Sequence, residues 1–363
     1  MYSLLRDVDR IPRTPGIMLF GAPGIGKSTQ VRIAAEVLAF LLRKRFVDVA
    51  ELMMGLRAGS KKARRLLNKI YKHPDRYFLY YEIRLPIVEP YDLQGTIRTL
   101  RIQGRETSVY VPFVWAILFS MCDGLIFMDE ITQVQREDVL SAAYQIILDK
   151  RVGEIVLSPR TIVVAAGNMP GDTELARSLD VGVLNRMLVL YVRYPSKEEH
   201  AEYERHLRRG DLVEWELERV RIRLSEVIGD GEGDPVIFIE RINEPSIYKN
   251  TRKGRTSGVL NIATPRTISW LSVLGNHIKD PRVFLVLAFG LLGSHGITIA
   301  RRIFPEALGE EDGSKPPACV AVLLKKLSSL LETGNITDIK KTLRDLASRL
   351  NNLSKKEPRD EYE

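Results

Sequence analysis

The sequence contains little cysteine and little histidine. Only two of its 363 residues are cysteine and five are histidine, and neither set has the spacing of a disulfide framework or a zinc site. The histidines are scattered along the chain, so they predict no catalytic triad. So few cysteines favour a reducing compartment, and we expect a cytoplasmic protein.

Long hydrophobic runs are absent as well. Asp123 interrupts the apolar stretch Phe113–Met128, and Val283–Leu292 is far shorter than the ~20 residues that a membrane-spanning helix needs. The first residues carry charges without an apolar segment, so no secretory signal is expected. Because 45% of the residues are hydrophobic, the chain can bury a sizeable core, and we expect a soluble protein with no membrane span.

Neither sign of charge dominates the chain. Fifty-four basic residues against 46 acidic ones give a net charge of +8, which allows contact with nucleic acid without indicating it. The most basic stretch, residues 61–72, contains six lysines and arginines. A solvated helix face is the interpretation that we favour there, and a patch for an acidic partner is the alternative.

A glycine-rich segment near the start of the chain is the most informative feature. The apolar run Ile17–Phe20 predicts a strand, Gly21–Ser28 fits G-x-x-x-x-G-K-[ST], and a helix is expected from Lys27 to about Arg45. Strand, loop and helix in this order are the context in which the motif binds a nucleoside triphosphate. The expected nucleotide-binding residues are Gly21, Ala22, Pro23, Gly24, Ile25, Gly26, Lys27, Ser28 and Thr29.

The residue types of this segment suit a triphosphate. Its glycines let the backbone turn tightly and present N–H groups, and the following helix directs its positive end at the same point. Lys27 is expected to reach the β- and γ-phosphates, and the Ser28 hydroxyl is expected to bind Mg²⁺. The sequence therefore predicts ATP and Mg²⁺ as cofactors.

A second motif predicts hydrolysis. The apolar strand Leu125–Met128 ends in Asp129 and Glu130, about a hundred residues after the glycine-rich loop. A carboxylate at such a strand end can hold Mg²⁺ through its waters, which fits Asp129. The next carboxylate can orient or deprotonate the attacking water, which fits Glu130.

The remaining chain divides near Pro195. Before it, strands are expected at 77–85, 152–157, 161–166 and 187–192, helices at 49–57 and 61–71, and a β-hairpin at 96–111 around a glycine turn. After it the patterns are mostly helical and end in amphipathic helices. We therefore expect an α/β nucleotide-binding domain over residues 1–195 and a helical domain over residues 196–363.

With these motifs the chain resembles the AAA+ ATPases, and within them the MoxR-type, helix-2-insert group, over roughly residues 10–305. The resemblance implies a P-loop fold with a parallel sheet core, β-hairpin insertions at 96–111 and 152–160, and a smaller α-helical lid domain. Asn168, after the strand Ile162–Gly167, resembles the sensor-1 residue, which helps position the water beside Glu130. Arg186 resembles the arginine finger that acts on a neighbouring subunit's nucleotide, and Arg266 resembles the sensor-2 residue of the lid.

The chain also departs from the family pattern. Thr132-Gln133 stands where the family often has Asn-Arg, and Asn185 precedes the finger where Asp is usual. Residues 46–75 are longer than the family usually has, and the pattern assigns them no role.

The resemblance implies a homo-oligomeric ring, expected to be a hexamer, that hydrolyses ATP and remodels a protein client in a chaperone-like way. A separately encoded von Willebrand factor A domain protein is the implied partner. One alternative is an AAA+ motor on DNA or RNA, whose hairpin arginines would line a pore. Another is a nucleotide-dependent binding switch with little turnover, against which Glu130 argues. The sequence does not identify the client.

Overall fold

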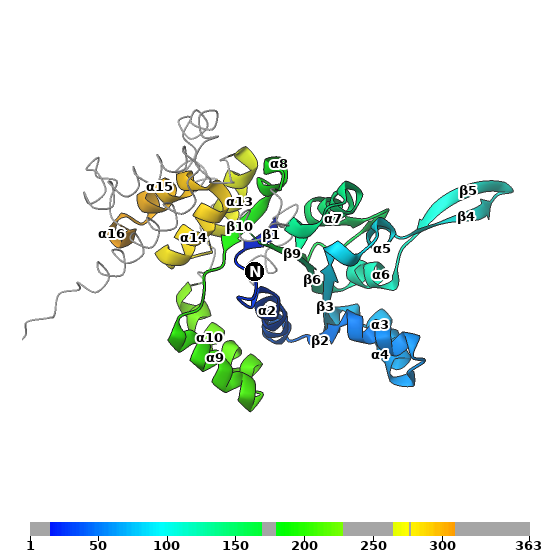
Figure 1. Ribbon diagram of the computed structural model, residues 1–363, viewed down its shortest axis with the longest axis horizontal. Coiled ribbons are helices and arrows are strands. Elements are labelled where there is room, and N and C mark those ends of the chain that lie inside the picture. The colour runs from blue at the N-terminus through cyan, green and yellow to red at the C-terminus, as the bar shows by residue number, and fades with distance from the viewer. Residues whose placement is uncertain (1–14, 169–178, 228–263, 276, 309–363) are drawn as a thin grey trace, which may run out of the picture.

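A six-stranded parallel sheet forms the centre of the computed structural model, which describes residues 15–168, 179–227, 264–275 and 277–308 (Figure 1). Its strands lie in the order β10 (Met187–Tyr191), β1 (Gly16–Phe20), β9 (Thr161–Gly167), β6 (Asp123–Asp129), β3 (Tyr77–Arg84) and β2 (Arg45–Asp48). The predicted fold class is confirmed: it is an α/β fold in which the glycine-rich loop joins β1 to a helix. The amphipathic helices predicted after residue 308 lie outside the described residues.

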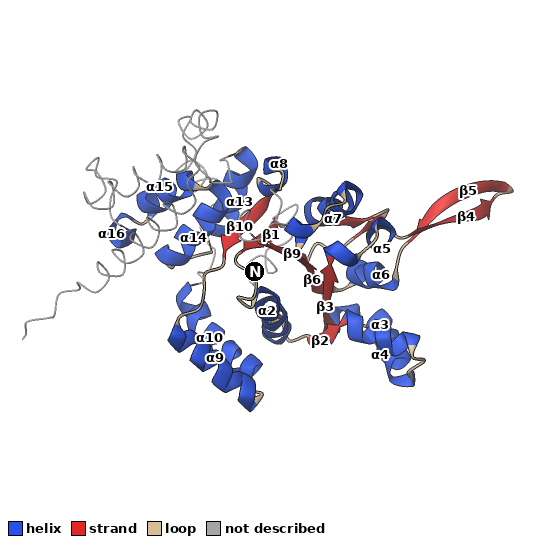
Figure 2. Cartoon of the chain, viewed as in Figure 1, coloured by secondary structure: helices blue, strands red, loops and turns tan. Residues whose placement is uncertain are grey.

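Both faces of the sheet are covered, which explains why its inner strands are almost continuously apolar. Side chains alternate between the faces along each strand. In β6, Leu125 and Phe127 join a hydrophobic cluster with α2 (Lys27–Leu41), whereas Ile126 and Met128 join a second cluster with α6 (Val114–Met121) and α7 (Glu137–Asp149). Figure 2 shows these helices on either side of the strands.

Four helices in the C-terminal part of the described chain share the hydrophobic cluster of α2. They are α13 (Pro265–Gly275), α14 (Pro281–Leu292), α15 (Ser294–Ile303) and α16 (Pro305–Leu308). Helix α14 lies directly against β10: a Cβ atom at Gly290 would stand 2.6 Å from the carbonyl oxygen of Val189. Two further helices, α9 (Lys197–Arg209) and α10 (Leu212–Val227), form a hairpin of which α10 contacts α2. The domain division at residue 195 remains a prediction.

Two β-hairpins extend from the α/β core. The predicted hairpin is confirmed as β4 (Thr96–Ile102) and β5 (Arg105–Val111), and it projects away from the sheet (Figure 1). Gln103 and Gly104 form its turn, with φ of 49° and 80°, the backbone that tight hairpins prefer. The single strand expected over 152–157 was wrong, because the chain reverses at Gly153 between β7 (Arg151–Val152) and β8 (Ile155–Val156). These two strands form the second hairpin that the resemblance implied at 152–160, with bounds of 151–156.

The first helix was also predicted too long. Helix α2 ends at Leu41, Arg43 adopts a φ of 56°, and the residues from Arg45 form β2. Parallel pairing of β2 with β3 overrides the helical pattern of this segment. The predicted helices then follow as α3 (Val49–Arg57) and α4 (Lys61–Lys72). The shorter elements are η2 (Pro74–Arg76), η3 (Leu85–Ile87), α5 (Pro90–Gln94), η4 (Ile131–Gln133) and α8 (Val181–Leu184).

Within the described ranges, none of the helices combines the length and the hydrophobicity that crossing a bilayer would require.

A lysine is buried at the end of α7. Lys150 adopts a left-handed backbone with φ of 51° and is only 5% exposed. Its Nζ atom has no hydrogen-bond partner among the described residues. Burial without a partner disfavours the charged form and lowers the pKa of Lys150 to about 7. Between about pH 7 and pH 10.5, Lys150 is therefore mostly neutral in the folded state but still protonated in the unfolded chain, where its pKa has the ordinary value of 10.5.

We expect Lys150→Met, which keeps the apolar stem, to raise the free energy of unfolding by several kcal/mol at neutral pH, since each pKa unit corresponds to about 1.4 kcal/mol. The gain is full at and below pH 7 and disappears as the pH rises towards the ordinary lysine pKa, where the unfolded lysine is also neutral. Guanidinium denaturation at several pH values measures it, with the exposed Lys62→Met as control. A gain independent of pH would contradict this explanation.

Candidate nucleotide-binding and hydrolysis site

Three neighbouring strand ends build the candidate site. Strands β1, β9 and β6 are adjacent and parallel, so their carboxyl ends meet at one edge of the sheet. The glycine-rich loop follows β1, Asp129 ends β6, and Asn168 follows β9. Residues that are about a hundred positions apart in the sequence are thereby brought within hydrogen-bond distance.

The loop before α2 depends on its glycines. Gly24 and Gly26 have φ of 76° and 86°, in the left-handed region where other residues are strained. At Gly21 a Cβ atom would lie 2.9 Å from the carbonyl oxygen of Val192. Gly26 is the N-cap of α2, and no side chain caps the helix or places an acidic group in its first turn. The first N–H groups of α2 thus suit an external anion.

Lys27 is the central side chain of the loop. Although lysine is rarely buried, Lys27 is 8% exposed. Its Nζ donates to the carbonyl oxygens of Gly21 at 2.7 Å and Ala22 at 2.9 Å, and to Oδ1 of Asn168 at 3.1 Å. The ammonium group therefore joins the loop to the residue after β9.

A second bond joins the loop to β6. The Ser28 hydroxyl donates to Oδ2 of Asp129 at 2.7 Å. A hydroxyl and a carboxylate this close are the hard oxygen ligands that Mg²⁺ prefers. No group of three or more metal-ligating side chains exists among the described residues.

Glu130 follows Asp129 in an unusual conformation. Its φ of 59° and ψ of 31° are left-handed, and its N–H donates to Oδ1 of Asp129 at 2.9 Å. Such a backbone is uncommon for a residue other than glycine. It turns the chain sharply from β6 into η4 and leaves Glu130 exposed beside the Ser28–Asp129 pair.

Thr132 is a site residue that the sequence did not reveal. It lies in η4, is fully buried, and its Oγ1 accepts a 3.0 Å hydrogen bond from the backbone N–H of Asn168. A Cβ atom at Gly167 would stand 2.6 Å from the Thr132 side chain, so the two segments are in close contact. The departure from the family pattern at this position is the signal that could have pointed to it.

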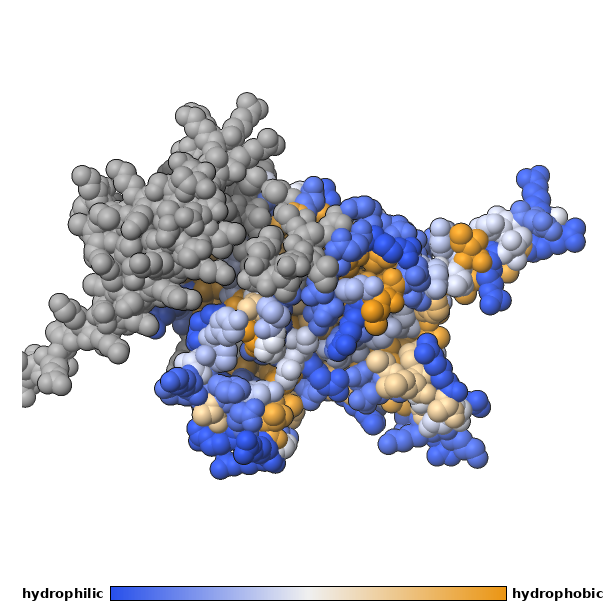
Figure 3. Space-filling view, viewed as in Figure 1, coloured by the Kyte–Doolittle hydropathy of each residue, from blue (hydrophilic) through white to orange (hydrophobic). Residues whose placement is uncertain are grey.

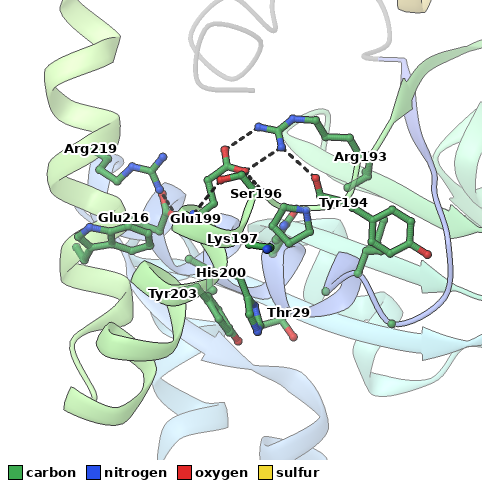
Figure 4. Close-up of a pocket in the computed structure, with 18 of the residues that line it drawn as sticks. Thr29, Arg193, Tyr194, Ser196, Lys197, Glu199, His200, Tyr203, Glu216 and Arg219 are labelled. Carbon is green, nitrogen blue, oxygen red and sulfur yellow. Dashed lines mark hydrogen bonds and ion pairs between the residues drawn. The ribbon is translucent and has the colours of Figure 1, made fainter. Parts of the chain in front are cut away.

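A cavity of about 890 Å³ adjoins the loop and α2 (Figure 4). Its volume is in the range of small-molecule sites. The sequence predicted the loop side of this cavity but not its other walls. Its lining residues include Gly24, Gly26, Thr29, Tyr194, Tyr203 and Trp215.

Charged and aromatic contacts hold the far wall of the cavity. Arg193, after β10, donates to both carboxylate oxygens of Glu199 in α9, at 2.6 and 2.8 Å, and this contact lowers the pKa of Glu199 to about 2. The ring of Trp215 in α10 stacks on the ring of His206 in α9, with 4.6 Å between their centroids. The Arg219 guanidinium lies 4.5 Å from the centroid of the Trp215 ring. These contacts join α9 to α10 and to the segment after β10, beside the cavity.

The two predicted arginines lie elsewhere. Arg186 is exposed immediately before β10, whose first residue pairs with Gly16 at the start of β1. Four strand steps of ~3.3 Å separate this level from the glycine-rich loop, roughly 13 Å. Arg266 is exposed at the second position of α13 and does not line the cavity. The structure thus joins Lys27, Ser28, Asp129 and Asn168 but brings neither arginine to them.

No protein-family model matches the chain, and no curated protein sequence matches it. Several solved structures are similar. A candidate ATPase from Cytophaga hutchinsonii has 17% identity and a TM-score of 0.40, covering 83% of this chain and 79% of that one. PCH-2 from C. elegans has 12% identity and a TM-score of 0.28, over 85% and 66%. NtrX from Brucella abortus has 12% identity and a TM-score of 0.26, over 95% and 67%. At such values the likeness carries no argument about function.

The Thr132 hydroxyl is open to a direct test. If it holds Asn168 in place, Thr132→Val should lower kcat about fivefold for the ATP hydrolysis that the motifs predict, since one hydrogen bond contributes ~1 kcal/mol, with KM for ATP nearly unchanged. Thr132→Ser retains the hydroxyl and should keep most of the activity. If both variants lose activity equally, packing rather than the hydrogen bond accounts for the effect.

Proposed function

We propose that this protein is an Mg²⁺-dependent ATP hydrolase of the AAA+ type. The observation that carries the proposal is the pair of hydrogen-bonded contacts at the sheet edge, Lys27 with Asn168 and Ser28 with Asp129. A nucleotide-binding loop, a magnesium-type ligand pair and a polar residue at the next strand end are the parts that hydrolysis of a nucleoside triphosphate requires.

Lys27 and the loop would bind the phosphates. Lys27 donates to three neutral oxygens, and a charged phosphate oxygen forms a stronger hydrogen bond with an ammonium group than a neutral oxygen does. The uncapped N–H groups of α2 add donors at the same place. The adjoining cavity would take the nucleoside, with Tyr194 and Tyr203 as aromatic walls.

Ser28 and Asp129 would hold Mg²⁺, Ser28 directly and Asp129 through waters. The ion, when bound, neutralises charge on the phosphate oxygens. The Ser28 hydroxyl donates its proton to Asp129 at 2.7 Å, so the lone pairs of its oxygen would stay available to the cation.

Glu130 and Asn168 would act on the attacking water. Glu130 is the candidate general base, because it is an exposed carboxylate directly after the magnesium-type ligand. Asn168 is linked to Lys27 by its side chain and to Thr132 by its backbone N–H. A change at the phosphates would therefore be passed through Asn168 to the segment after Glu130.

Arg186 would complete the site of a neighbouring subunit. Arg186 lies level with the start of β1, whereas the glycine-rich loop follows the end of β1, so Arg186 does not reach the site of its own chain. Its side chain is exposed and is therefore accessible to another chain. An arginine that acts in this way stabilises charge in the transition state. Repeated head-to-tail contacts of this kind close into a ring, and we propose a hexamer.

A chaperone-like action of the MoxR type on a protein client is the finer part of the proposal. Helices α13–α15 share the α2 hydrophobic cluster, so a shift of α2 on nucleotide binding would move the helices that begin with α13, which carries Arg266. The projecting hairpin with its exposed Ile97, Leu100 and Tyr110 would offer apolar side chains to a client. A von Willebrand factor A domain protein is the partner proposed to present it.

Glu130→Gln removes the base but keeps size and backbone conformation, so we expect ATP turnover to fall about a hundredfold or more while ATP binding is retained. Phosphate release and equilibrium binding of a fluorescent ATP analogue measure the two effects. The exposed Glu154→Gln is the matched control and should leave turnover unchanged. Full activity in Glu130→Gln would show that another group serves as the base.

The trans role of Arg186 can be tested by mixing chains. The Arg186→Ala chain has an intact loop but no finger arginine, and the Lys27→Ala chain has the arginine but a defective loop. A ring made of either variant alone should therefore be inactive. In evenly mixed rings about a quarter of the interfaces combine an intact loop with an intact arginine, and activity should return in that proportion if the ring closes head to tail. Absence of rescue in rings shown to be mixed by mass spectrometry would count against action in trans.

A further inference from the structure

Helix α4 bears a charge pattern that the nucleotide site does not use. Half of its twelve residues are basic and none is acidic. The basic residues are Lys61, Lys62, Arg64, Arg65, Lys69 and Lys72, and all six are exposed. None of them forms an ion pair with another described residue.

This pattern works against the helix itself. Lys61 and Lys62 occupy the first turn, where the positive end of the helix dipole disfavours cations. Lys61, Arg65 and Lys69 follow one another at four-residue spacing, which places like charges side by side. Lys69 and Lys72 in the last turn suit the helix dipole, but the lysines of the first turn and the four-residue spacing do not, so an external anion is the more direct explanation for them.

The docked face of α4 leaves its basic face free. Ala63 and Ile70 are buried, and Leu66 and Leu67 pack against the core cluster, so the apolar side of the helix is used internally. The α3–α4 lobe stands out from the sheet at the lower right of Figure 1, and hydrophilic side chains cover its outer margin in Figure 3. Among the exposed residues of α4, Tyr71 is the one aromatic side chain.

We propose that the basic face of α4 binds the phosphate backbone of a nucleic-acid duplex, independently of base sequence. Lys61, Arg65, Lys69 and Lys72 form a stripe along the helix of about 16 Å at 1.5 Å per residue. A strand with one phosphate per 3.4 Å of axis presents about five charges over this length.

Other anionic partners fit the face less well. A bilayer-bound helix inserts an apolar face into the lipid, and the apolar face of α4 is already docked. Interfaces with proteins rely on buried aromatic and apolar anchors, which this face lacks. Single strands are bound through stacking on several aromatic rings, and α4 exposes only Tyr71. A duplex backbone requires only the aligned cations.

The test uses the full chain and fluorescent DNA and RNA duplexes of about 20 base pairs, titrated over a range of salt concentrations. Lys61→Gln, Arg65→Gln and Lys69→Gln together should weaken binding at least tenfold at low salt. They should also lower the salt slope of log K by roughly 2.7, since each lost phosphate contact removes about 0.9. Glutamine preserves helicity, so the melting temperature should not fall and basal ATP hydrolysis should be unchanged.

The matched control carries the same loss of charge on the hairpin, Arg98→Gln with Arg101→Gln and Arg105→Gln, and should bind duplexes like the parent protein. If both triple variants lose the same affinity for the duplexes, net charge alone explains the binding and the proposal is overturned. If only the hairpin variant loses affinity, the hairpin and not α4 binds the duplex, which also overturns the proposal. Tighter binding to poly-glutamate or to anionic phospholipid vesicles than to either duplex would also overturn it. Because binding is measured without ATP, failure here leaves the ATPase proposal intact.

Discussion

The hydrogen bonds of Lys27 and Ser28 tie three strand ends together at one edge of the sheet. Lys27 joins the loop after β1 to Asn168 after β9, and Ser28 joins it to Asp129 at the end of β6. Both donors come from adjacent positions at the start of α2, so the helix position and the register of three strands have to be correct together. The site is therefore as well defined as the central sheet, because the same backbone hydrogen bonds determine both.

The two faces of the central sheet pack against different sets of helices. The clusters on opposite sides of β6 are formed by alternating residues, and α13–α15 belong to the cluster of α2. Gly290 brings α14 into direct backbone contact with β10, whose end continues into Arg193 and the cavity. Helices distant from the glycine-rich loop thus rest on the elements that surround the candidate site, which would allow the proposed hydrolysis to be coupled to a change of shape.

The functions proposed for the periphery depend on segments that add little to this core. The hairpin 96–111 exposes apolar side chains on two strands only, and two strands alone are marginally stable. Helix α4 places two lysines at the positive end of its dipole and like charges at four-residue spacing. Features that are unfavourable to folding and far from the chemistry are more simply explained by contacts with other molecules.

The sequence alone determined the parts that depend on neighbouring residues. The glycine loop, the Asp129–Glu130 strand end and the turn of the hairpin follow from local backbone preferences and apolar runs, and the structure places them as expected. Tertiary contacts decided the rest. Strand β2 exists because β3 pairs with it, against a helical pattern. Thr132 reaches Asn168 across 36 positions, and α9 and α10 wall the cavity only after packing. No local pattern encodes such contacts, because their energy comes from groups that only the folded chain brings together.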